Sequence, residues 1–248
     1  MTKATPRQPA PPTKRNPYLL PMILGILVVA LTTALGVLLA GNRDSQASEL
    51  DKLPNYTQVK GTIVVDGLKY EKQPRLGDPG AKVKVIEFAD FKCPACKVWK
   101  QKYLERFIAE YVDTGKVEFY FMNYAFLDRD SYLAASAGEA IYHQSNDKFW
   151  EFASKLYDQQ GDESKIWATE KFLLRFVKDN LEGIDYDLFE HDLKEGTYMF
   201  DVKEDFKIAG AYGVNGTPKF MVNGELVALS SLDSSYDELT AAIDAVLD

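Results

Sequence analysis

The sequence predicts an α/β domain that contains an inserted group of helices and follows one N-terminal transmembrane helix. The transmembrane helix is predicted by an uncharged apolar run at residues 18–40. A strand, a helix and a second strand succeed one another between residues 82 and 122, and a helical crossover of this length implies a parallel strand pair. Helical periodicity continues over about residues 128–210, before a hairpin and a last helix.

The N-terminal part of the chain predicts a tail, an anchor and a linker. Residues 1–17 contain five prolines, which favours a disordered tail. At about 1.5 Å per residue, a helix over 18–40 is long enough to cross a bilayer core of roughly 30 Å. Polar residues at 41–58 predict a linker, and the pattern of a folded domain begins at about residue 59 and extends to residue 248.

The charges that flank the apolar run predict its orientation. Four basic residues and no acidic residue precede it, whereas Asp44, Glu49 and Asp51 follow it closely. The positive-inside rule therefore places the tail in the cytoplasm and the domain outside the cell membrane. There are two alternatives. A buried core helix is usually shorter than this run, and a cleaved signal peptide would use a site such as residues 45–47.

Composition narrows the class of partner. The chain has a net charge of −8, and from residue 42 onward 25 basic residues stand against 37 acidic ones. Nucleic-acid binding requires clustered Lys and Arg, so the acidic domain argues against such a partner. The chain has only two cysteines, Cys93 and Cys96, whereas disulfide-stabilised secreted scaffolds have many. The pair therefore indicates chemistry rather than a scaffold.

The first half of the domain predicts a central strand, an amphipathic helix and a second strand. The strand at 82–89 is first alternating and then apolar, as expected of a buried strand, and it follows turn residues at 77–80. The helix ends at Gly115 and the second strand covers 117–122. One stripe of the helix is aromatic, and it consists of Trp99, Tyr103, Phe107 and Tyr111.

The second half of the domain predicts helices, a hairpin and a final helix. Aromatic residues recur at helical spacing within 128–210, and core packing explains this spacing better than a cofactor site does. Two short strands at 219–222 and 225–228 flank Asn223-Gly224, a pair typical of a tight hairpin turn. An amphipathic helix from about residue 236 closes the chain.

The two cysteines have the spacing of a redox pair at the start of a helix. Cys93 is expected at the N-cap, and Pro94 fits the first turn, where no N–H bond is lost. A helix N-terminus favours negative charge, so the pKa of Cys93 should fall and its thiolate should attack or leave readily. Cys96 lies one turn further and is expected to be more buried. It would resolve a mixed disulfide.

The cysteine pair has two other interpretations. A structural disulfide in so short a loop would stabilise the fold little. A zinc site would need four ligands, and the remaining candidates, His143 and His191, are not spaced as a ligand pair. No compact acidic ligand set is visible either, so the sequence locates no metal site, although a structural metal is not excluded.

Glu87 interrupts the apolar strand six residues before Cys93. One interpretation is an alternating strand residue that faces solvent. The functional interpretation is a buried acid beneath the helix start that relays a proton to or from Cys96. Burial would raise the pKa of Glu87 and allow this role at neutral pH.

Two segments resemble the DsbA-like proteins of the thioredoxin superfamily. Residues 87–96, Glu-Phe-Ala-Asp-Phe-Lys-Cys-Pro-Ala-Cys, preceded by Gly-Asp-Pro at 77–79, look like the active-site segment of that family. Residues 213–224 look like its cis-proline loop and the hairpin that follows. The resemblance spans about residues 59–248 and is greatest to the membrane-anchored BdbD-type proteins of Gram-positive bacteria. It implies a thioredoxin fold with a helical insertion at about 128–210.

The resemblance also implies roles for residues outside the cysteine pair. Thr217-Pro218 would form a cis peptide bond packed against the cysteines, and the backbone of Thr217 would bind a substrate strand. Taken alone, Pro218 would be an ordinary turn proline. Ala95 is a departure, because enteric DsbA proteins have His there. Alanine offers the thiolate no charge or donor, so the oxidising strength does not follow from the sequence.

The resemblance implies a thiol-disulfide oxidoreductase without a cofactor other than its cysteine pair. It would oxidise dithiols of secreted or cell-surface proteins and be reoxidised by a membrane quinone-linked oxidase of the DsbB or BdbC kind. Two alternatives are a reductase or isomerase with the same fold, and a non-enzymatic surface binding module with a permanently closed disulfide. Measurement of the redox potential would distinguish an oxidase from a reductase or isomerase. A thiol-trapping assay would distinguish an enzyme from a binding module.

Overall fold

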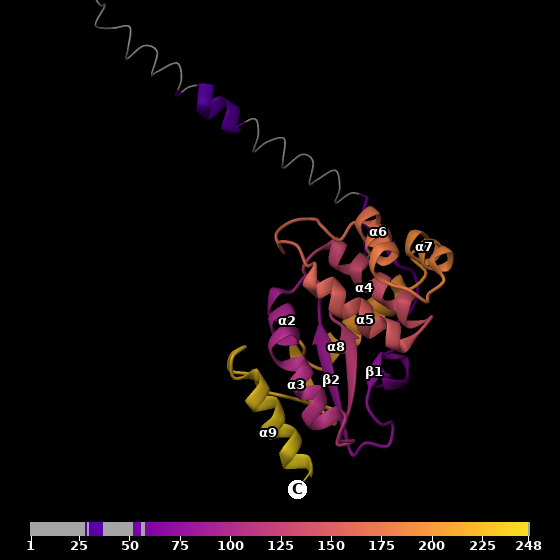
Figure 1. Cartoon of the computed structure of the whole chain (residues 1–248), viewed down its shortest axis with the longest axis vertical. Coiled ribbons are helices and arrows are strands. Elements are labelled where there is room, and N and C mark those ends of the chain that lie inside the picture. Colours follow the sequence, from indigo (N-terminus) through magenta and orange to yellow (C-terminus); the bar gives the residue numbers. More distant parts are fainter. Residues whose placement is uncertain (1–27, 29, 37–51, 56–57, 248) are drawn as a thin grey trace, which may run out of the picture. The chain divides into compact units, whose positions relative to one another are not determined.

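The computed structural model describes residues 28, 30–36, 52–55 and 58–247 (Figure 1). Residues 28 and 30–36 are helical. Within the described residues, no helix is long and apolar enough to cross a membrane. The predicted tail, both ends of the predicted span at 18–40 and most of the predicted linker lie outside the described residues. Residues 48–248 form one compact unit, which contains the cysteine pair.

A mixed sheet of five strands lies at the centre of this unit. The strand order is β1-β3-β2-β4-β5, and β2 and β3 are parallel, as the sequence predicts. The other pairs are antiparallel. Both central strands are buried along almost their whole length. The strands are β1 (Arg75–Leu76), β2 (Val83–Ala89), β3 (Val117–Asn123), β4 (Lys219–Val222) and β5 (Glu225–Leu226).

Helices between β2 and β3 cover one face of the sheet together with α9 (Ser235–Leu247) (Figure 1). Trp99 stands at the centre of this layer, and its ring lies 4.6 Å from that of Phe220 and 6.3 Å from that of Phe119. The predicted aromatic stripe thus packs against the sheet. The crossover alternates α- and π-helical turns, and its segments are α2 (Pro94–Trp99), η3 (Lys100–Leu104), α3 (Glu105–Phe107) and η4 (Ile108–Val112).

The stretch predicted as helical at about 128–210 consists of five helices. Four of them begin where a side-chain oxygen accepts a backbone N–H of the first turn, and the caps are Asp128, Ser145, Thr169 and Asp185. The helices are α4 (Arg129–Tyr142), α5 (Asn146–Asp158), α6 (Glu170–Asn180), α7 (Tyr186–Glu195) and α8 (Met199–Ala211). Through Ile208 and Ala209, α8 covers the sheet face opposite to α2. We call α4 to α7 the helical insertion.

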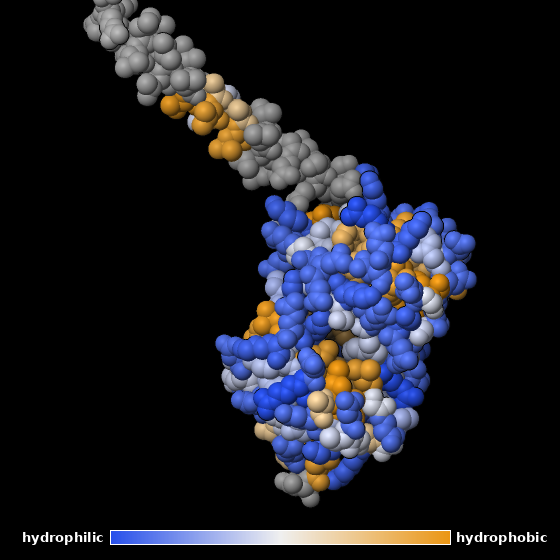
Figure 2. Space-filling model, in the orientation of Figure 1, coloured by the Kyte–Doolittle hydropathy of each residue, from blue (hydrophilic) through white to orange (hydrophobic). Residues whose placement is uncertain are grey.

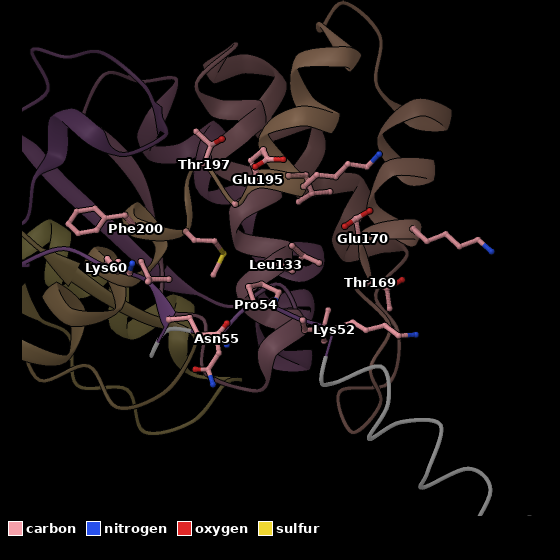
Figure 3. A pocket seen from close by; sticks show the side chains of 18 residues that line it. Lys52, Pro54, Asn55, Lys60, Leu133, Thr169, Glu170, Glu195, Thr197 and Phe200 are labelled. Carbon is pink, nitrogen blue, oxygen red and sulfur yellow. The ribbon is translucent and has the colours of Figure 1, made fainter.

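A short segment before the predicted domain start also packs on the helical insertion. Leu53 lies within the predicted linker but is only 7% exposed, and it belongs to the same core cluster as Leu133 of α4. A cavity of about 890 Å³ lies beside it, between residues 52–55 and 58–60, α4, the start of α6 and the end of α7 (Figure 3).

The hairpin after the helical insertion forms as predicted but is shorter. Asn223 and Gly224 both have positive φ, at 48° and 90°, which is the backbone of a tight two-residue turn. The predicted strand at 225–228 is observed as Glu225–Leu226, and Val227 after it is buried in the core, 8% exposed. Its N–H still donates to the Phe220 carbonyl at 2.9 Å.

Candidate active site

Cys93 occupies the N-cap of α2, a few residues after the end of β2. Its backbone is extended, with φ −73° and ψ 118°, and Pro94 follows at the first helical position. The Cys93 N–H donates to the Asp90 carbonyl at 2.9 Å, and the Cys93 carbonyl accepts the Lys97 N–H at 3.2 Å. The sulfur therefore stands at the positive end of a helix, at the position that the sequence predicts.

The Cys93 thiol is in an environment that favours its ionised form. Two features oppose ionisation, since the protonated Sγ donates to the Thr217 carbonyl at 3.4 Å and the residue is only 7% exposed, but the donors around the sulfur outweigh them. The pKa of Cys93 is lowered to about 7, chiefly by a hydrogen bond from the Cys96 thiol and further by the backbone N–H groups of Cys96 and Ala95, while burial opposes this shift. About half of the Cys93 side chains would therefore be thiolate at neutral pH.

Cys96 is in the opposite situation, one helical turn further along α2. It is fully buried. Burial is the main cause that raises the pKa of Cys96, and the hydrogen bond to Cys93 and the charges of Cys93 and Glu87 raise it further. Of the two thiols, Cys93 is thus the more exposed and more acidic, and Cys96 stays protonated. This asymmetry suits one attacking sulfur and one resolving sulfur.

Glu87 points from β2 towards the side of the sheet that α2 covers. It alternates with Val83 and Val85, which pack in the same cluster as Trp99. The residue is only 5% exposed, so the interpretation of a solvent-facing strand residue is wrong. Burial, and then the charge of Cys93, raise the pKa of Glu87 to about 8. The structure therefore places a largely protonated acid next to the redox pair at neutral pH.

Glu87 also lines a cavity of about 690 Å³ that opens between α3, α5 and β1. Phe121, Trp150 and Tyr157 form part of its apolar wall, and Glu105 lies at its edge. Figure 2 shows hydrophobic residues at the bottom of a hollow in this part of the surface. The cavity gives the Glu87 carboxyl a side that is not closed by protein, which is consistent with proton exchange between Glu87 and water.

Thr217 and Pro218 lie opposite the cysteines, directly before β4. The peptide bond between them is cis. The contact of the Thr217 carbonyl with the Cys93 sulfur brings together residues 124 apart in the sequence. The side chain of Thr217 also lowers the pKa of Cys93. The structure thus joins the two segments on which the sequence resemblance depends.

Comparison with known proteins identifies the family. The family model described as "Thioredoxin" matches residues 69–245. Over 178 residues the chain is 43% identical to the "Probable disulfide bond formation protein D" of Bacillus anthracis. The aligned residues make up 72% of this chain and 80% of that protein. The chain belongs to the DsbA-like thioredoxin family.

Two further relatives support this assignment. Over 175 residues the chain is 31% identical to "Disulfide bond formation protein D" of Bacillus subtilis. The aligned residues make up 71% of this chain and 77% of that protein. The crystal structure of oxidised BdbD from Bacillus subtilis superposes with a TM-score of 0.66 at 30% identity, covering 75% of this chain and 99% of that one. The fold is therefore a thioredoxin fold, and the chain is a thiol-disulfide oxidoreductase whose redox group is a cysteine pair.

Sequence reasoning missed two residues of the helical insertion and its loops that contact the redox turn. The Tyr157 hydroxyl donates to the Asp90 carbonyl at 3.3 Å, and the Gln160 side chain donates to the Cys93 carbonyl at 3.0 Å. They lie at the end of α5 and in the loop after it, and Gln160 is 67 residues from Cys93. Neither belongs to a local motif, so only the fold of this DsbA-like chain reveals them.

The histidines considered for a zinc site lie on different elements. His143 follows α4 and stacks on Tyr198 at a ring distance of 4.2 Å, while His191 is part of α7. In the part of the chain that the structure describes, no group of three or more His, Cys, Asp and Glu side chains is arranged to hold a metal ion.

Proposed function

We propose that this chain introduces disulfide bonds into secreted or cell-surface proteins from a membrane-anchored, extracytoplasmic position. The observation that carries this proposal is the asymmetry of the pair, with an acidic Cys93 thiol at the helix start and a fully buried Cys96. A stabilised Cys93 thiolate favours the reduced pair and so makes the oxidised pair a better electron acceptor. The relatives named disulfide bond formation protein D support the same direction.

The exchange uses both cysteines and Glu87. A substrate thiolate attacks the Cys93 sulfur of the oxidised pair, the bond between Cys93 and Cys96 breaks, and its electron pair leaves on Cys96. Glu87 supplies the proton that makes Cys96 a neutral thiol. The second substrate thiolate then attacks the substrate sulfur of the mixed disulfide, and Cys93 leaves as thiolate. The substrate has lost two electrons and gained a disulfide, and the cysteine pair has gained the two electrons.

The backbone around Thr217 is the proposed binding edge for the substrate chain. Its carbonyl lies beside the Cys93 sulfur, so an extended peptide paired there would present a cysteine directly to Cys93. Pro94 is exposed and Ala95 is partly buried on the other side of the sulfur, and neither side chain carries a charge. Recognition through the main chain suits an enzyme that oxidises many different proteins.

The proposed location follows from the sequence. The apolar run at 18–40 would anchor the chain, and the four basic residues before it would keep the tail in the cytoplasm. Outside the membrane the pair would meet an oxidising compartment. A membrane quinone-linked oxidase of the DsbB or BdbC kind would then take the two electrons from the reduced pair and restore its disulfide.

The redox potential of the Cys93–Cys96 pair tests the direction of the reaction. Equilibrium of the purified chain with a glutathione buffer should yield a potential well above the about −270 mV of thioredoxin and nearer the about −120 mV of DsbA. The same preparation should oxidise a reduced dithiol protein. A potential near that of thioredoxin would instead support the reductase alternative.

Trapping in cells tests the substrates and the location together. The Cys96→Ala variant should accumulate mixed disulfides between Cys93 and secreted proteins, because the resolving thiol is missing. The double variant Cys93→Ala, Cys96→Ala is the matched control and should form none. Protease added to intact protoplasts should degrade the domain and leave the tail protected. A total lack of adducts would favour the binding-module alternative.

A further inference from the structure

The turn before Cys93 contains a charged side chain with no solvent exposure. Lys92 precedes Cys93 directly, and its ammonium donates to an Asp130 carboxylate oxygen at 2.7 Å, with both side chains 0% exposed. The ammonium also donates to the Lys165 carbonyl at 3.0 Å. Removing two charges from water is costly, and apolar residues of similar size often stabilise a fold as well as such a pair does. Stability alone therefore does not explain the pair.

Asp130 extends this connection to the loop between α5 and α6. Its second carboxylate oxygen accepts the backbone N–H groups of Trp167 at 3.0 Å and Ala168 at 3.2 Å. One ion pair therefore joins three parts of the fold, namely the redox turn, α4 and the loop that contains Gln160.

Gln160 acts on the same turn from the other end of that loop. Its side-chain amide donates to the Phe91 carbonyl at 2.8 Å and to the Cys93 carbonyl at 3.0 Å. These two carbonyls flank Lys92 on either side. The Cys93 carbonyl is also the acceptor for the Lys97 N–H at the start of α2. Gln160 thus fixes the orientation of the peptide group at the N-cap.

The turn is already anchored without these polar contacts. The Phe91 ring is 1% exposed and lies within an aromatic cluster of the sheet and the helical insertion. Its ring neighbours are Phe121, Phe149, Phe152 and Tyr157, at centroid distances of 5.3 to 6.4 Å. Packing of this kind fixes where the turn lies but is not directional. Hydrogen bonds to named carbonyls fix how its peptide groups are rotated.

We propose that Gln160 and the ion pair of Lys92 and Asp130 are positioning residues for disulfide exchange. They act through the backbone of the turn and hold the Cys93 sulfur in line with the N–H groups at the start of α2. A small rotation at the N-cap would move the sulfur away from those donors. The inference deepens the proposed function, since the step that it serves is exchange at Cys93.

Gln160→Ala tests the first part of this inference. In the reduced protein, alkylation of Cys93 by iodoacetamide should slow about three- to tenfold at pH 6, because the thiolate fraction falls as the pKa of Cys93 rises. The rate at high pH, where the thiol is fully ionised, and the midpoint of thermal unfolding should change little. The matched control is Gln159→Ala, the neighbouring residue, whose amide donates to the Asn180 side chain. An unchanged pH profile in Gln160→Ala would overturn the proposal.

The double variant Lys92→Met, Asp130→Leu tests the ion pair without leaving a buried charge unpaired. It should fold and show the same shift of the alkylation profile to higher pH. A folded double variant with the wild-type profile would mean that the pair only supports structure. If the double variant does not fold, Gln160→Ala decides alone. Alkylation needs no substrate protein, so a thioredoxin-like potential would refute the oxidase direction and leave this test intact.

Discussion

Two of the places where the molecule buries carboxyl groups differ in what surrounds the acid. Glu87 lies beneath the redox helix, where burial and the Cys93 charge alone raise its pKa to about 8. Glu139 of α4 and Asp205 of α8 form the second site. Asn123 donates to both acids, at 2.6 Å and 3.3 Å, and Gln73 donates to Asp205 at 2.8 Å.

Glu87 is available for reaction, whereas Glu139 and Asp205 are held in place by hydrogen bonds. Burial raises the pKa at all three carboxyls, and hydrogen bonds oppose this shift only at the second site, where the pKa of Asp205 is about 7. Both sites border a cavity, but Glu87 lies next to a reacting sulfur, whereas the amide contacts of Glu139 and Asp205 join helices to the sheet. The same burial therefore serves proton transfer in one place and architecture in the other.

Removal of the Cys93 sulfur should produce the largest contrast between the two sites. Cys93→Ser should lower the rate of dithiol oxidation by more than about 10³-fold, because the variant cannot form the Cys93–Cys96 disulfide that accepts the electrons. Glu139→Gln should keep the rate within about threefold of wild type. A continuous assay of disulfide formation in a reduced protein measures both. If Cys93→Ser oxidised dithiols at the wild-type rate, Cys93 would not be the sulfur that reacts with the substrate.

The second site should also make the free energy of unfolding depend on pH. Unfolded Asp and Glu titrate near pH 4, and the folded pKa values of Glu139 and Asp205 are raised, so the folded state keeps protons that the unfolded state loses. Stability is therefore fully present below about pH 4 and is lost as the pH rises through about 7. Through these two acids alone, the free energy of unfolding should be about 2–4 kcal/mol lower at pH 8 than at pH 5.

Urea unfolding with chelator present, so that no cation compensates the carboxylates, checks this dependence. In Glu139→Gln, the free energy of unfolding should decline less steeply above pH 6 and should be higher at pH 8 than in the wild type. Glu195→Gln, at an exposed position at the end of α7, should keep the wild-type slope. A Glu139→Gln variant with the same slope as wild type would show that Glu139 is not an origin of the decline.

Glu87 should control a proton and therefore the pH profile of the reaction. Its pKa of about 8 means that the acid is protonated at neutral pH and loses this form above pH 8. Glu87→Gln should slow the release of Cys96 by about tenfold or more at pH 7 and abolish the rate decline near pH 8. Single-turnover oxidation of a dithiol peptide by the oxidised enzyme, followed at several pH values, measures the rate of Cys96 release.

The matched control for Glu87 is Glu105→Gln, an exposed acid at the edge of the same cavity. It should keep both the rate and the profile of the wild type. If Glu87→Gln and the wild type had the same pH profile of the rate, another group would donate the proton to Cys96.

Local patterns predict the parts of this fold that depend on neighbouring residues. The parallel strands, the N-cap position of Cys93 and the turn at Asn223-Gly224 follow from periodicity and turn chemistry, and the structure has them where the sequence predicts them. The alternation of residues places the end of β5 two residues beyond Leu226, because it does not show where pairing with β4 stops. The thioredoxin fold came from the resemblance of two segments, and the comparisons confirm it.

The polar contacts of the site could not be predicted in this way. Gln160 and Asp130 lie in segments whose periodicity marks only helices and loops, and their partners are 67 and 38 residues away. A buried Gln or Asp becomes recognisable only when the fold shows which backbone groups it satisfies. Asp205 is a further example, since its sequence neighbours do not reveal that it is buried beside Glu139.

The smallest expected effect concerns the hydroxyl of Thr217, which the structure adds to the role predicted for its backbone. The side chain lowers the pKa of Cys93, while the carbonyl accepts the Cys93 thiol at 3.4 Å. Thr217→Val keeps the shape and the carbonyl and removes the hydroxyl. The pKa of Cys93 should rise by about half a unit, so alkylation at pH 6 should slow about threefold.

Alkylation rates from pH 4 to 9 resolve a change of this size. Thr240→Val, at a half-buried threonine of α9 whose hydroxyl donates to the Asp237 carbonyl, is the control and should behave as wild type. A threefold loss in Thr217→Val that disappears at high pH would assign the effect to the stability of the thiolate. An equal loss at every pH would assign it to access to the sulfur, and would leave the main-chain carbonyl as the part of Thr217 that matters for exchange.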